Sequence, residues 1–80
     1  MLSQLRLIEV LDADLRLCDE ANPADEPGQL QKMFVHDTLL KHREWASEAG
    51  DDQTVLEQIV RSLERNMLLS FQRWREESTV

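Results

Sequence analysis

The chain has 80 residues, so it forms at most one domain, whose core buries only about 60% of the surface that the unfolded chain exposes. Nine basic and sixteen acidic residues give a formal net charge of −7, which disfavours nucleic acid as a ligand because Lys and Arg supply most phosphate contacts. Cys18 is the only cysteine, so neither an internal disulfide nor a zinc site built from several thiols can reinforce this small core.

Two clusters of helix-breaking residues divide the chain into three amphipathic segments. The first cluster spans residues 22–28 and holds both prolines and a glycine, and the second spans residues 50–52 and begins with a glycine. Elsewhere the apolar residues recur every three or four positions, the spacing of a helix that buries one side. The sequence therefore predicts an all-α fold, a small three-helix bundle in which a long antiparallel helical hairpin packs with an N-terminal helix.

The first helix is expected over residues 3–21. Its apolar side consists of Ile8, Leu11, Leu15 and Cys18, with Leu7, Val10 and Leu17 beside them. A side this wide indicates contact with more than one neighbour. Asn22 ends the helix because the residue before a proline is pushed out of the helical region of backbone angles.

The second helix is expected over residues 27–49, with Pro27 as its first residue and Gly50 as a left-handed stop. It has two apolar sides. One consists of Leu30, Met33, Phe34, Leu40 and Trp45, and the other of Val35, Leu39, Ala46 and Ala49. Asp37, Lys41 and Glu44 interrupt the first of these sides. A helix that is apolar on two sides is expected to lie between two neighbours.

The third helix is expected over residues 54–75, followed by a frayed tail over residues 76–80. Its apolar residues keep a heptad spacing of four and three, through Leu56, Val60, Leu63, Met67, Ser70 and Trp74. Asp51, Asp52 or Thr54 can cap its first turn. Residues 1–26 hold two Arg and seven acids, a net charge of −5, whereas residues 55–75 hold four Arg and two acids, a net charge of +2. These opposite signs favour the first and last helices lying side by side.

No residue pattern indicates catalysis, a metal site or a cofactor site. His36 and His42 are six positions apart, on different faces, and are expected at the surface or its boundary. Asp12 and Asp14 lack the glycine and glutamate of a calcium-binding loop. Cys18 lies on the apolar stripe, where a free cysteine behaves as a small hydrophobic residue. We therefore expect a protein that is not an enzyme.

The heptad of the third helix is the best candidate for an interface. The residues expected to contact a partner are Val60, Leu63, Met67, Phe71 and Trp74 of the third helix and Trp45 of the second. Large aromatic residues near helix ends, where a small bundle covers them poorly, often anchor interfaces. The sequence therefore predicts a non-enzymatic protein–protein interaction module, an adaptor, chaperone or inhibitor, that docks by helix faces and forms a homodimer.

Two other functions fit the sequence. The acids of residues 1–26 suit a decoy or regulator that occupies a basic or nucleic-acid-binding surface of its target. A small metal- or ligand-binding domain is the other alternative. No apolar run approaches the roughly 18–20 residues that cross a bilayer, and the first residues lack the apolar stretch of a signal peptide, so we expect a cytoplasmic protein that binds no membrane.

Overall fold

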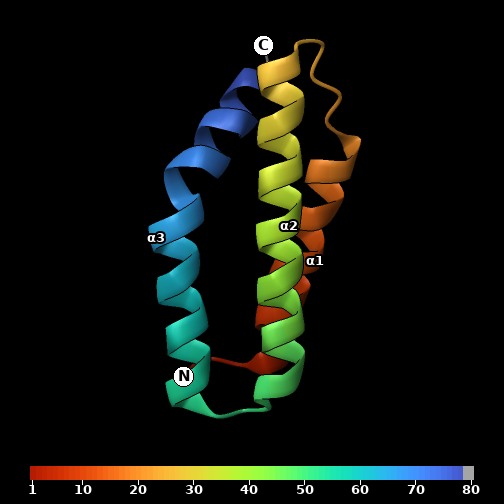
Figure 1. The fold of residues 1–80 in the computed structure, drawn as a ribbon. Coiled ribbons are helices and arrows are strands. Elements are labelled where there is room, and N and C mark those ends of the chain that lie inside the picture. Colours follow the sequence, from red (N-terminus) through yellow and green to blue (C-terminus); the bar gives the residue numbers. More distant parts are fainter. Residues whose placement is uncertain (79–80) are drawn as a thin grey trace.

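The protein is a bundle of three α-helices, as a computed structural model shows for residues 1–78, with side chains described for residues 1–66 (Figure 1). The helices are α1 (Gln4–Glu20), α2 (Glu26–Ala49) and α3 (Gln53–Ser78). This confirms the all-α three-helix fold, and α2 and α3 form the expected antiparallel hairpin (Figure 1).

The helix boundaries agree with the sequence-based ones to within one residue, except at the end of α3. That helix continues to Ser78, so residues 76–78 are helical rather than part of a frayed tail. The reason is local, because no Gly or Pro follows Arg75 and the next two residues are glutamates, which favour helix. Thr79 and Val80 lie outside the described residues.

The breaker clusters end the helices as their chemistry predicts. Asp52 is the residue that caps α3, since its Oδ1 accepts hydrogen bonds from the N–H groups of Thr54 (3.0 Å) and Val55 (3.4 Å). Gly50 ends α2 with φ of +61°, a region in which a side chain is strained. Gly28 has a different role, because a Cβ there would lie 2.8 Å from Cβ of Pro23, so glycine lets the linker pass close to the first turn of α2.

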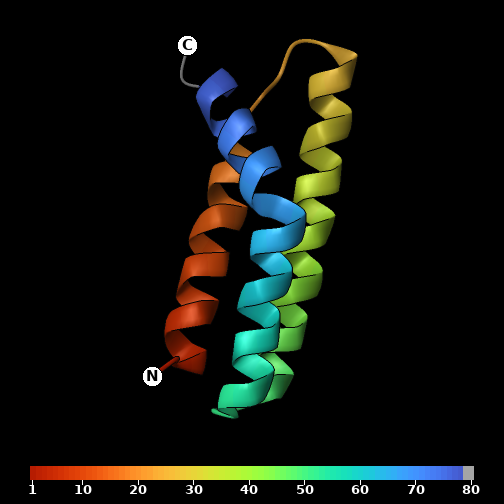
Figure 2. The same cartoon turned by 90° about the vertical axis from the view of Figure 1, so that its left-hand side faces the viewer.

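One side of α2 forms the centre of the core. Its buried residues are Val35, Leu39, His42 and Ala46. From α1 the core takes Leu11 and Cys18, and from α3 it takes Leu56 and Ile59. Both neighbouring helices pack closely on α2, which therefore lies between them as expected (Figures 1 and 2).

The second apolar side of α2 does not pack against a neighbour, so that part of the sequence-based expectation is wrong. Its residues Leu30, Met33, Phe34, Leu40 and Trp45 are all exposed, by 37% or more. Both α1 and α3 instead contact the single side that contains Val35 and Leu39. The charged residues Asp37, Lys41 and Glu44 explain the difference, because burying that side would remove their charges from water.

The opposite charges of the first and last helices do not bring them tightly together. Both helices start at the same end of the molecule and run parallel, but they approach each other much less than either approaches α2 (Figures 1 and 2). Exposed ion pairs contribute little free energy, whereas the apolar sides of both helices gain more by packing on α2. A groove is left between α1 and α3.

A preformed apolar groove between α1 and α3

The groove has a volume of about 420 Å³, within the range of natural binding pockets. The buried residues Leu11 and Leu39 form its floor. Its apolar walls are Leu2, Leu7 and Val10 on one side and Val60 and Leu63 on the other. The other lining residues are Met1, Ser3, Arg6, Asp14 and Glu64. The groove is therefore mainly apolar and includes a few charged residues.

The heptad of α3 explains one wall of the groove. Leu56 and Ile59, near the start of the helix, are buried in the core. Val60 and Leu63 follow on the side of α3 that faces α1, and they remain half-buried. Two of the six residues expected to contact a partner thus lie together in the groove.

Of the other four expected interface residues, only Trp45 has a described side chain. The side chains of Met67, Phe71 and Trp74 lie outside the described residues. Trp45 is on α2, 37% exposed, with its ring centroid 6.1 Å from that of His42. It does not line the groove.

The wall formed by α1 is a part of the site that the sequence alone does not identify. In the sequence, Leu7 and Val10 only widen the apolar side of the first helix. That excess width is the available signal, because residues beyond those needed to contact α2 must face something else. Val10 is 47% exposed, so it lies outside the closed core.

Two glutamine side chains fix the end of the groove that lies at the start of α1. Gln53 accepts a hydrogen bond from the N–H of Leu2 (2.8 Å) and donates one to the carbonyl oxygen of Leu2 (2.6 Å). Gln4 donates to the carbonyl oxygens of Ala46 and Ser47, at 3.0 and 3.1 Å, near the end of α2, where helical carbonyl groups lack partners within the helix. The start of α1 is thereby held against both other helices.

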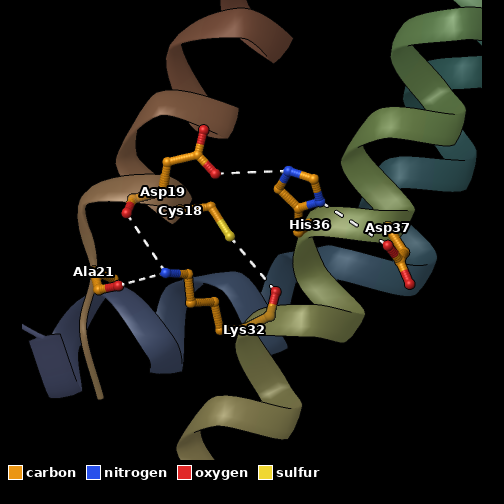
Figure 3. A network of polar contacts seen from close by, with 6 residues as sticks. All are labelled: Cys18, Asp19, Ala21, Lys32, His36 and Asp37. Carbon is orange, nitrogen blue, oxygen red and sulfur yellow. Dashed lines mark hydrogen bonds and ion pairs between the residues drawn. The ribbon is translucent and has the colours of Figure 1, made fainter.

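The far end of α1 is held on α2 by the polar network shown in Figure 3. Nζ of Lys32 donates to the carbonyl oxygens of Ala21 (2.8 Å) and Asp19 (3.5 Å), where the helix dipole is negative. His36 lies 3.6 Å from the Asp19 carboxylate. Midway along the helix, Arg43 pairs with Asp12 at 3.1 Å. Because α1 is held at both ends and in the middle, the groove exists before any partner binds.

Cys18 behaves as the sequence predicts. Its side chain is fully buried, and Sγ donates to the carbonyl oxygen of Lys32 at 3.5 Å (Figure 3). Burial raises the pKa of the thiol, and Lys32 lowers that pKa by less than burial raises it. The thiol therefore lacks the depressed pKa of a reactive cysteine.

His42 is a correction, because it is buried, with 8% exposure, and not at the surface or its boundary. Nδ1 lies 2.7 Å from the Thr38 carbonyl oxygen, which only accepts, so Nδ1 carries the proton and donates. Nε2 then accepts from the hydroxyl of Ser62 at 2.8 Å, which links α2 to α3. The residue is buried because it follows Val35 and Leu39 on the buried side of the helix. His36, in contrast, is half-buried as expected.

The described part of the chain offers no metal centre and no membrane span. Within it, no three His, Cys, Asp or Glu residues gather where they could hold a metal ion. In the same part, no helix is both long enough and apolar enough to cross a bilayer.

No protein family, no curated protein and no solved structure matches this chain.

Proposed function

We propose that the protein is a non-enzymatic protein–protein interaction module, of the adaptor, chaperone or inhibitor kind, that accepts the apolar face of a partner helix between α1 and α3. The observation that carries this proposal is the apolar lining of a preformed groove. An amphipathic helix that lies in an apolar groove is a recurrent mode of recognition.

The energetics suit a helix better than a small polar ligand. Covering an apolar side chain such as Val10, Val60 or Leu63 contributes up to about 1.5–3 kcal/mol when burial is complete. Because the walls are already fixed by Gln53, Lys32 and Arg43, little conformational entropy is lost when the partner binds.

The direct test is titration with a neutral amphipathic peptide of Leu and Gln, followed by two-dimensional amide NMR. We expect the largest chemical-shift changes at Leu7, Val10, Val60 and Leu63, because these residues line the groove. The variant Val10→Asp should weaken the binding, since it puts a charge on the wall.

The matched control is Leu40→Asp, which places the same charge on an exposed apolar residue of α2 outside the groove. That variant should bind the peptide as the parent does. Shifts confined to α2, or no binding at millimolar peptide, would contradict the proposed function.

A further inference from the structure

We propose that the partner helix in the groove is α1 of a second copy of this chain, antiparallel to the first, with the two-fold axis beside Val10. In this dimer Arg6 of each copy meets Asp14 and Glu64 of the other. The inference rests on the proposed function and names its partner.

The groove-facing side of α1 is complementary to itself. Arg6, Val10 and Asp14 follow one another at intervals of four residues, and all three line the groove. When two such helices lie antiparallel with their Val10 residues opposed, each Arg6 lies beside the Asp14 of the other copy. A two-fold interface requires this reciprocity, because residue i then contacts j while j contacts i.

Because α1 and α3 run parallel, the carboxylate of Glu64 on α3 lies at a similar height along the groove to that of Asp14 on α1. The two helices start together where Gln53 holds Leu2 (Figures 1 and 2). Asp14 lies ten residues beyond Gln4, the first residue of α1, and Glu64 lies eleven beyond Gln53, the first residue of α3. At 1.5 Å per residue they stand about 15 and 17 Å along their helices. The guanidinium of Arg6 from the second copy therefore meets two acids, a geometry that suits its several N–H donors.

The direction of the second helix follows from the fold. α2 runs antiparallel to its two neighbours, and a helix opposite α2 would also touch both α1 and α3 (Figure 1). If it runs antiparallel to them, the four helices have the arrangement of an antiparallel four-helix bundle. The positive start of the incoming helix then lies near Asp14 and Glu64, and its negative end lies near Arg6.

Val10, at the middle of the groove-facing side of α1, also favours a second copy over a foreign helix as the partner. Val10 is 47% exposed at the midpoint between Arg6 and Asp14. In the dimer it covers Val60 and Leu63 of the other copy, which are half-buried in the single chain. Both grooves are filled at once, and the partner completes a small core that no disulfide reinforces.

The test is a pair of charge reversals examined by sedimentation equilibrium. Arg6→Glu should weaken self-association by at least about tenfold, because the new carboxylate at position 6 then faces Asp14 and Glu64 of the other copy. Asp14→Arg should weaken it similarly, because the new guanidinium at position 14 then lies beside Arg6 of the other copy.

An equimolar mixture of the two variants should form a heterodimer that recovers most of the parental affinity. Both pairs between positions 6 and 14 are attractive again in that mixture, although the new carboxylate at position 6 still faces Glu64. A folding defect in either variant could not produce this rescue.

The matched controls are Arg16→Glu and Glu9→Arg, which reverse exposed charges of α1 that do not line the groove. Both should dimerise like the parent. The inference is overturned if the parent stays monomeric at millimolar concentration, if either single variant dimerises normally, or if the mixture is not rescued. If the dimer fails one of these tests but the neutral peptide still binds the groove, the proposed function stands without the dimer. If the peptide does not bind either, both the dimer and the proposed function are contradicted.

Discussion

The two apolar faces of α1 are covered to different extents. The side that faces α2 is closed, with Leu11 and Cys18 fully buried and with polar contacts from Lys32 and Arg43 along its edges. The side that faces α3 is open, with Val10 half-exposed and with a hydrogen bond from Gln53 to Leu2 at one end. Apolar character alone therefore does not identify a core. A residue of α1 belongs to the core only where a neighbouring helix covers it.

The largest expected effect on stability is at Leu11, and the adjacent residue Val10 provides the contrast. Leu11→Ala should lower the free energy of unfolding by about 2–5 kcal/mol, because the side chain is only 1% exposed and its removal leaves a cavity. Val10→Ala should change the stability of the monomer by no more than about 0.5 kcal/mol, as is usual at exposed sites. Urea unfolding at low protein concentration measures both. Equal losses would mean that the groove side belongs to the core.

The turn that joins α2 to α3 gives the next effect. Gly50→Ala should destabilise the protein by about 1–3 kcal/mol, because Gly50 has φ of +61° and ψ of −146°, a region that residues with a Cβ rarely adopt. Thermal unfolding measures the loss. The exposed helical residue Ser47 provides the control, since Ser47→Ala should leave the stability within about 0.5 kcal/mol of the parent. A Gly50→Ala protein of parental stability would show that the turn carries no strain.

The contact between His42 and Ser62 should give a smaller effect. A double-mutant cycle with His42→Leu and Ser62→Ala should yield a coupling of about 0.5–1.5 kcal/mol, the usual net contribution of one hydrogen bond. Chemical unfolding of the two single variants and the double variant provides the cycle. Additive effects would mean that the polar link between α2 and α3 contributes nothing to their packing.

The smallest effect is expected at the end of α1. Lys32→Met keeps the apolar stem but removes the ammonium group that caps the carbonyl oxygens of Ala21 and Asp19, and should cost about 0.3–1 kcal/mol in thermal unfolding. The loss should shrink at high salt, because salt screens partly exposed charges. A salt-independent loss would show that packing of the stem matters more than the charge.

The fold could be predicted because the breaker clusters and the apolar periodicity are local signals. Residues 22–28 and the Gly50 turn place the helix ends, and the apolar spacing of the third helix predicts correctly that Leu56 faces inward. These features follow from backbone geometry, which depends on the order of residues and not on distant contacts.

The groove could be predicted only in part, because it depends on how far apart two helices stand. The heptad identifies Val60 and Leu63, but the opposing wall of Leu7 and Val10 emerges only when α1 and α3 are placed on α2. The burial of His42 is also missed by the sequence-based interpretation. The signal is present, since position 42 continues the spacing of Val35 and Leu39, but a polar ring ordinarily indicates the surface.

Chemical cross-linking at Val10 is the sharpest test of an antiparallel contact between the α1 helices of two copies. In the variant Val10→Cys, the two-fold axis of the dimer brings the new thiols of both copies close together, while the buried Cys18 stays unreactive. A short bismaleimide should therefore link most of the protein into covalent dimers, and the same reagent should leave Leu40→Cys almost entirely monomeric. Dimers from Leu40→Cys and none from Val10→Cys would show that the groove between α1 and α3 is not where this protein meets its partner.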